Sequence, residues 1–599
     1  MNINMLPKIE ICNWKDNKII FYCLISLIVL WRIPFLNKGI DYTDTGFNLT
    51  NYSYFLDNEY PKGIGLFMTN IIGSVIYNSI NSYHLLIFRI IHYVLGLITT
   101  FFAYKLLNKY IKINLLLAIL LVLSFWNKDG EAIYSYYPMT CLLLFLSLWL
   151  LHEGIIFKKN FFIFISGIFC GINVFFRIPN VLFICLGISI FYYDYLKNES
   201  IKYIAKRFIM YFIGASIGFC IDVIIMSYFI NLYDFFDSLL GMIKIGIGYH
   251  NNITNNTIGI EEIEDAHSLF VLMKCICKQI VKAGILCCLF FPFSFIINRI
   301  KIYVQGKSYF RSFEIIIFIT ICMIFFILTK QKYINTWHDL ICLISLVLFV
   351  FLVYNHKSIN LEHSLLYITA IMLSFFSVIG SDLGLYRLGI IRQLIIPLLI
   401  LAINDLYAIY RDENDKININ INILNSFVLL LYIGMTIIGI LILIPKTYMD
   451  DTYSKLDTYV NKEIIVLLGM KTTKERADSI NEFYSVMQRN EFKDLEMAVF
   501  GYYPLAFVLS ANKNYFYQIQ PCIDYSSVKV YKLLNVIEKN KKLPLIVISH
   551  VNQNRNKSSH FTSKAKEAVL QYMLKQGDYT IEYESKNFTI YYPLQMNNN

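Results

Sequence analysis

The chain has 599 residues, of which 57% are hydrophobic, 16% aromatic and only 16% charged. A soluble protein of this length cannot bury such a large apolar share, so the composition predicts a polytopic α-helical membrane protein. The formal net charge of +11 is spread over short loops, which fits Lys and Arg retained on the cytoplasmic side better than nucleic-acid binding. The 13 cysteines lie almost entirely in apolar segments without zinc-site spacing, so we interpret them as small core residues.

The first apolar segment, residues 19–36, has no small-residue cleavage site after it and is predicted to remain as a membrane anchor. Further apolar runs of spanning length follow it, and together they predict about thirteen spans. These runs cover residues 85–104, 113–126, 138–152, 160–176, 179–195, 208–231, 283–298, 313–329, 339–354, 364–380, 389–409 and 422–444.

The apolar run at residues 63–80 is long enough for another span, but the charge pattern argues against a crossing. Lys8, Lys15 and Lys18 place the N-terminus in the cytoplasm by the positive-inside rule. Most later basic loops fall on the same side only if residues 63–80 stay outside. These loops contain Lys105, Lys109, Lys112, Lys158, Lys159, Lys202, Lys206, Arg207, Arg299, Lys301, Lys307, Arg311, Arg411 and Lys416. We therefore predict an external juxtamembrane segment here and an odd number of spans.

The first external loop, residues 37–62, places two acids a few residues from the membrane surface. Asp41 and Asp44 precede a short aromatic amphipathic run, residues 47–56, and the loop ends at Lys62. An acid at a membrane boundary is costly without water or a partner, so it is a candidate for function. The alternative is that both acids are solvated loop residues.

This order of parts resembles the start of the GT-C glycosyltransferases, membrane enzymes that use polyprenyl-phosphate sugars. The family includes protein O-mannosyltransferases and the aminoarabinose transferase of lipid A. Its first external loop carries an Asp-Glu pair followed by a Tyr/Ala-rich helix; here Asp44 matches the Asp, and Thr45 replaces the Glu. The resemblance implies a multi-span bundle with two external juxtamembrane helices. It also implies that Asp44, or Asp41, is the base that deprotonates an acceptor hydroxyl.

The resemblance further implies that cations neutralise the phosphate of the donor. Lys62 corresponds to a cationic or Pro-rich site of the family. Lys332, Arg387 and Arg177 are further candidates, because they lie in predicted external turns and Arg in particular matches phosphate geometry. Arg177 is equally well interpreted as an interface anchor. No cofactor is required on this scheme, and a bound divalent metal is an open alternative.

Candidates for the sugar and acceptor site combine acids with aromatic residues at predicted span ends. Tyrosines stack on apolar sugar faces, and carboxylates accept hydrogen bonds from hydroxyls. The alternative is an interfacial aromatic belt with solvated charges. The candidates are Asp129, Glu131 and Tyr137 in the second external loop, Trp337 and His338 in a later turn, and Asp382 and Tyr386 beside Arg387.

The composition changes near Pro445, which divides the chain into a multi-span domain at residues 1–445 and a polar domain at residues 446–599. Strands are predicted at residues 497–500 and 543–549, followed by a helix at 563–575 and a terminal strand pair at 579–584 and 588–592. The polar part is therefore expected to be a small external α/β domain. It has no Gly-rich phosphate motif and no zinc spacing, so we expect it to contact or cover the acceptor.

Two classes of function fit these features. The first is a glycosyltransferase of the inner membrane that moves a sugar from a polyprenyl phosphate to a lipid, glycan or protein acceptor. The second is a transporter, flippase or assembly factor for a lipid-linked envelope precursor. Transporters place ionisable groups near the bilayer midplane and often show repeated halves. Here the acids cluster at one membrane boundary and no repeat is visible, which favours the enzyme.

Overall fold

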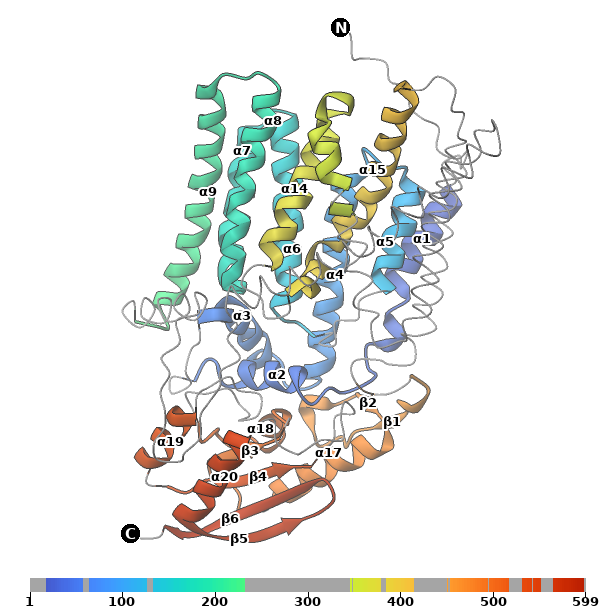
Figure 1. The fold of residues 1–599 in the computed structure, drawn as a ribbon. Coiled ribbons are helices and arrows are strands. Elements are labelled where there is room, and N and C mark those ends of the chain that lie inside the picture. Colours follow the sequence, from blue (N-terminus) through green and yellow to red (C-terminus); the bar gives the residue numbers. More distant parts are fainter. Residues whose placement is uncertain are drawn as a thin grey trace, which may run out of the picture.

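The computed structural model describes two kinds of structure, a bundle of long helices and a mixed α/β part at one end of it (Figure 1). The described residues are 18–57, 64–125, 133–231, 345–346, 348–378, 384–413, 450, 453–493, 495–501, 503–516, 530–540, 542–550 and 564–596. The helical part precedes the α/β part in the chain, as predicted. The expected boundary at residues 445–446 lies outside the described residues.

Six described segments are long and apolar enough to cross a membrane, and the chain is a multi-pass membrane protein. They are Lys18–Phe35, His84–Leu107, Tyr136–Ile156, Ile178–Leu196, Ile201–Ser227 and Leu388–Leu406. Three other expected spans are shorter apolar helices here, at Ile113–Ser124, Asn160–Phe176 and Leu361–Ser377. The expected spans at residues 283–298, 313–329 and 422–444 lie outside the described part, so the predicted total of about thirteen stays a prediction.

The bundle contains nine α-helices with described bounds, a further helical stretch at residues 348–354 in the predicted span at residues 339–354, and the 3₁₀ segments between them (Figure 1). The helices are α1 (Lys18–Leu30), α4 (His84–Leu107), α5 (Ile113–Phe125), α6 (Tyr136–Ile156), α7 (Asn160–Ile172), α8 (Ile188–Leu196), α9 (Ile201–Ser227), α14 (Leu361–Val378) and α15 (Arg392–Glu413). The main 3₁₀ segments are η3 (Asn173–Phe176), η4 (Ile178–Gly187) and η7 (Gly384–Ile391). Pro179 is the second residue of η4, in the first turn, where a proline is tolerated because the first N–H groups of a helix have no internal partner.

Helices α7 and α9 pack with their backbones in direct contact. Each carries two glycines four residues apart, Gly167 and Gly171 in α7 and Gly214 and Gly218 in α9. A Cβ added to any of them would overlap a carbonyl oxygen of the facing helix. Small residues at this spacing let membrane helices approach closely, which gives van der Waals packing that lipid does not offer.

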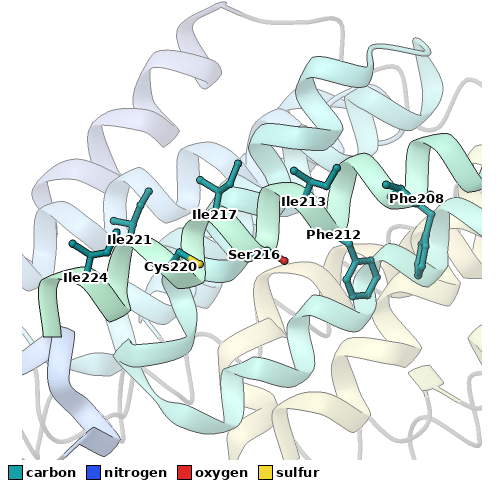
Figure 2. Close-up of a pocket in the computed structure, with 9 residues that line it drawn as sticks. Phe208, Phe212, Ile213, Ser216, Ile217, Cys220, Ile221 and Ile224 are labelled. Carbon is teal, nitrogen blue, oxygen red and sulfur yellow. The ribbon is translucent and has the colours of Figure 1, made fainter. Parts of the chain in front are cut away.

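The outer face of α9 is apolar and exposed. Figure 2 shows Ile213, Ile217, Ile221 and Ile224 along this face, with the small side chains of Ser216 and Cys220 forming a shallow hollow between them. The four isoleucines are each at least 40% exposed among the described residues. Such a surface is unfavourable in water, and contact with lipid chains explains it.

Two short helices lie between the bundle and the α/β part (Figure 1). They are α2 (Asp44–Tyr54) and α3 (Phe67–Asn78), which pack against each other at the ring of Tyr52 on Gly73. Thr69 of α3 donates a hydrogen bond to the Phe176 carbonyl of η3 at 3.2 Å. Helix α3 has 12 residues and lies between the bundle and the α/β part (Figure 1), and the external juxtamembrane position of residues 63–80 stays a prediction.

The C-terminal part contains a four-stranded sheet with strand order β3-β4-β6-β5. Strand β3 (Met497–Phe500) runs parallel to β4 (Leu545–Ser549), and β6 (Phe588–Met596) is antiparallel to both β4 and β5 (Gly577–Glu584). The helices are α17 (Lys474–Met487), α18 (Leu505–Ser510), α19 (Val530–Lys539) and α20 (Lys564–Gln576). All four main strands were predicted. The small pair β1 (Thr458–Tyr459) and β2 (Lys471–Thr472) was not.

One apolar cluster extends from the bundle into the α/β part. It joins side chains of the first loop, α2 and α4 to side chains of α17, α18 and the sheet. Its members include Ile40, Tyr42, Leu49, Tyr52, Phe88, Phe483, Tyr503, Leu505 and Phe588, all at most 1% exposed. The first loop is therefore buried between two bodies, and its acids lie at their boundary.

Candidate active site

Asp41 is a buried helix-capping residue. Its Oδ1 atom accepts hydrogen bonds from the Thr43 main-chain N–H at 3.2 Å and from the Thr43 hydroxyl at 2.8 Å. Its Oδ2 atom accepts from the Thr45 N–H at 2.9 Å, near the start of α2. The carboxylate thereby satisfies a donor that the helix leaves open, in place of the Thr43 side chain. With both oxygens engaged and 1% exposure, Asp41 is poorly placed to act as a base.

Replacing this cap is expected to weaken the fold. Asp41→Ala removes three hydrogen bonds at the start of α2 and should lower the free energy of unfolding by about 1–2 kcal/mol. Thermal unfolding of the detergent-purified protein measures this loss. Asp478→Ala, an exposed acid on α17, is the matched control and should leave the melting temperature almost unchanged. Equal melting temperatures for both variants would contradict the capping role.

Asp44 is the first residue of α2 and is only half-buried. Its main-chain carbonyl accepts a hydrogen bond from the Asn48 side-chain amide at 2.8 Å, which fixes the first turn. The open N–H groups and the dipole at a helix N-terminus favour a carboxylate there. Asp44 therefore has a fixed backbone and is partly accessible at the boundary between the bundle and the α/β part. Asp41 is not accessible there, because it is buried.

The position of α2 is set by the α/β part. A Cβ added to Gly46 would overlap the main chain of Leu505 in α18, so the two helices meet where only glycine fits. The Thr50 hydroxyl donates to the Pro504 carbonyl at 3.0 Å, and the Tyr54 hydroxyl donates to the Asn512 carbonyl at 3.0 Å. The helix that starts at Asp44 cannot shift without breaking these contacts.

The linker before the acids is held by the bundle through Arg89 of α4. This side chain is 2% exposed, and its guanidinium donates to three main-chain carbonyls of the linker. The acceptors are Leu36 at 3.3 Å, Lys38 at 2.8 Å and Gly39 at 2.7 Å. A charged donor to a carbonyl makes a stronger bond than a neutral one, and Arg supplies several in one plane.

The same linker pairs with strand β2 on the side of the α/β part. The Gly39 N–H donates to the Lys471 carbonyl at 2.7 Å, and the Lys471 N–H donates to the Asn37 carbonyl at 2.7 Å. Beyond the linker, the Tyr42 ring packs edge-on to Tyr503 at 5.0 Å between centroids. Burial raises the pKa of the Tyr42 phenol, so it stays neutral at physiological pH.

The structure brings two of the predicted sugar-binding regions together. Tyr137 lies in the first turn of α6, and its hydroxyl is 3.2 Å from where a Cβ on Gly389 of η7 would lie. Segment η7 also contains Tyr386 and Arg387, although their side chains lie outside the described part. These regions are about 250 residues apart in sequence, and the sulfur of Cys141 one turn along α6 lies 3.7 Å from the Ile390 carbonyl.

Arg177 does not lie in an exposed turn. It is 7% exposed and connects η3 to η4, where its carbonyl accepts the Asn180 N–H at 2.8 Å. The neighbouring Phe176 is covered by α3 through Thr69. This burial makes Arg177 a weaker candidate for binding a lipid phosphate.

Seven predicted site residues lie outside the described residues, so their placement stays a prediction. They are Lys62, Asp129, Glu131, Lys332, Trp337, His338 and Asp382. Among the residues that are described, no group of three His, Cys, Asp or Glu side chains is arranged to hold a metal ion.

The residues that bind the first loop in place were not predicted from the sequence. Arg89 carried a signal, since an arginine within the apolar run at residues 85–104 needs a partner or water. Lys471 and the other contacts from the α/β part had no local signal, because their partners lie more than 400 residues away.

Comparisons with known proteins find no matching protein family and no matching curated protein. Among solved structures, the fold is similar to crystal structures of the Archaeoglobus fulgidus oligosaccharyltransferase. One of these, tethered with an acceptor peptide containing the NVT sequon via a disulfide bond, has a TM-score of 0.46 and 10% identity, covering 96% of this chain and 74% of that chain. Another, a complex with Zn and sulfate, has a TM-score of 0.43 and 11% identity, covering 96% and 73%.

Proposed function

We propose that the protein is a membrane glycosyltransferase that moves a sugar from a polyprenyl-phosphate donor to an extracytoplasmic acceptor. The observation that carries this proposal is the placement of Asp44. Asp44 is a half-buried residue at the N-terminus of α2, in a loop fixed by both the bundle and the α/β domain. A base that acts on a lipid-linked donor and an extracytoplasmic acceptor is expected at the end of the membrane spans, beside the α/β domain.

In this mechanism Asp44 takes the proton from an acceptor hydroxyl. The hydroxyl oxygen then attacks the anomeric carbon of the sugar from the face opposite the lipid phosphate. The bond between that carbon and the phosphate oxygen breaks, the polyprenyl phosphate leaves, and the configuration is inverted. General bases of this kind contribute about 10²–10⁴-fold to a rate when they lie within hydrogen-bond reach of the hydroxyl.

The departing phosphate requires cations at the span ends. Lys62, Lys332 and Arg387 are the proposed ligands, because a preorganised cation stabilises the charge that develops on the leaving oxygen. Tyr137 and Tyr386 are the proposed sugar contacts, since α6 and η7 lie side by side. These cations neutralise the phosphate by themselves, so the proposed mechanism does not require a metal.

The proposal places the α/β domain and Asp44 outside the membrane and the N-terminus in the cytoplasm. Cysteines introduced at exposed positions test this with a membrane-impermeant maleimide on intact cells. Lys462→Cys, in the α/β domain, should be labelled, and Lys159→Cys, between α6 and α7, should be labelled only after permeabilisation. Labelling of Lys159→Cys in intact cells would contradict this topology.

Reconstitution distinguishes the enzyme from a transporter. Purified protein in liposomes is supplied with polyprenyl-phosphate sugars and a set of lipid, glycan and peptide acceptors, and products are identified by mass spectrometry. The proposal expects a glycosylated acceptor and free polyprenyl phosphate in equal amounts. Movement of the intact lipid-linked sugar across the bilayer without transfer would overturn it in favour of a flippase.

A further inference from the structure

We propose that Arg476 and Asp450 of the α/β domain are positioning residues that set the place of Asp44, so that the active site is complete only when this domain is docked. This inference rests on the proposed function, because it assigns a role in the same reaction. It is carried by a set of contacts that converge on one residue of the first loop, Ile40.

Both main-chain polar groups of Ile40 are bound by this pair. The Arg476 guanidinium donates to the Ile40 carbonyl at 2.6 Å, and the Ile40 N–H donates to Oδ2 of Asp450 at 2.9 Å. Arg476 and Asp450 also bind each other, with 3.0 Å between Nε and Oδ1. Two charge-assisted hydrogen bonds and one ion pair thus link the three residues in a closed ring, which fixes the direction as well as the position of the loop.

The pair is shielded from solvent. The side chain of Asp450 is 0% exposed and that of Arg476 is 12% exposed. The Tyr42 ring lies 4.8 Å below the guanidinium, and the Thr472 hydroxyl donates to Asp450. Removing one partner of a buried charge pair leaves the other without compensation, so a single substitution should disturb the loop strongly.

The constraint passes to Asp44 through the chain itself. Ile40 is followed by Asp41, whose carboxylate caps α2, and α2 begins at Asp44. Arg89 holds Gly39 on the opposite side. The main chain just before the capping residue is therefore bound by the bundle and by the α/β domain. These contacts fix where the first turn of α2 begins.

Docking of the domain does not depend on this pair. The apolar cluster shared by the loop, α4 and the α/β domain buries Phe88, Tyr503 and Leu505 completely, and the Thr50 and Tyr54 hydrogen bonds are separate from Arg476. Loss of Arg476 should thus loosen the loop and leave the domain in place, which separates positioning from general stability.

The test compares Arg476→Ala, Arg476→Lys and a control, Arg489→Ala. Arg489 belongs to the same domain, but its side chain is 42% exposed and pairs with the surface acids Glu491 and Glu582. Its guanidinium also lies 6.0 Å from the Phe492 ring and 5.9 Å from the Tyr583 ring, away from the first loop. Hydrogen exchange of the intact protein in detergent should show at least 10-fold faster exchange at residues 39–45 in Arg476→Ala, with the sheet unchanged. The control should match the wild type. Equal protection of residues 39–45 in all three variants would overturn the proposal.

Kinetics supply the second readout. A displacement of about 1 Å at a catalytic group can cost about 100-fold in rate, so kcat for Arg476→Ala should fall by 10- to 100-fold with KM for the donor changed less than threefold. Arg476→Lys keeps one donor and should recover part of kcat. If kcat falls equally in Arg476→Ala and Arg476→Lys, and the melting temperature falls in both, the role of Arg476 is merely structural. If the wild type transfers no sugar, the proposed function fails, and hydrogen exchange alone decides whether the pair fixes the loop.

Discussion

Asp44→Asn is expected to reduce sugar transfer by at least about 100-fold, the lower part of the range that a general base contributes. The amide keeps the size and shape of the side chain but has no basicity. Helix α2 should remain intact, because Asn is accepted near helix N-termini and the contacts of Gly46, Thr50 and Tyr54 with the α/β domain do not involve the carboxylate. Initial rates with a reconstituted donor and acceptor measure the effect.

Asp478→Asn removes the same charge from an exposed position on α17 and is the control. Its rate should equal that of the wild type. Donor binding by Asp44→Asn should change little, since a base acts on the acceptor. Full activity in purified Asp44→Asn would remove Asp44 from the mechanism.

Gly171→Leu is expected to have the largest effect on the fold. The first added atom would overlap the Ala215 carbonyl oxygen, and the rest of the side chain has no space between α7 and α9. Overpacking alone costs about 1–3 kcal/mol, and separating two backbones in contact should add to it. We expect little monodisperse protein after detergent extraction and a clearly lowered melting temperature in what remains.

The matched control is Gly96→Leu in α4. An added Cβ there meets no described atom within 4 Å, and Gly96 lies on the exposed face of its helix. The same chemical change should leave yield and melting temperature unchanged, or raise them slightly, because Leu favours a helix more than Gly does. A normal melting temperature for Gly171→Leu would show that the tight α7–α9 contact does not contribute to stability.

The sequence predicted the elements whose signals are local. The strands at residues 497–500 and 545–549 are runs of mostly apolar residues. Helix α20 ends directly before Gly577, but this glycine begins strand β5 and is not among those with positive φ, so it does not form a left-handed cap. The pair β1 and β2 was missed because two-residue strands have no periodicity to detect. Helix α7 ends at Ile172 and is followed by the 3₁₀ segment η3 inside the predicted span at residues 160–176, since an apolar run gives no sign of where its hydrogen bonding changes.

The candidate site was predicted only in part. The loop, its two acids and the following amphipathic helix could be located, because acids beside an apolar segment stand out. The sequence could not tell the cap from the candidate base. That distinction depends on which carboxylate meets the N–H of Thr45, and both Asp41 and Asp44 are within a few residues of it. The bond from Arg476 to Ile40 joins residues 436 positions apart, and no local pattern encodes it.

The bond between Ile40 and Asp450 also orders events during synthesis. These residues are 410 positions apart, and ribosomes add about 5–20 residues per second, so the first loop leaves the ribosome roughly 20–80 s before its partner. A chain that stops before Asp450 carries Asp44 but lacks the contact that we propose positions its carboxylate. Incomplete products are thus expected to be inactive, and a stop codon placed before Asp450 should abolish transfer.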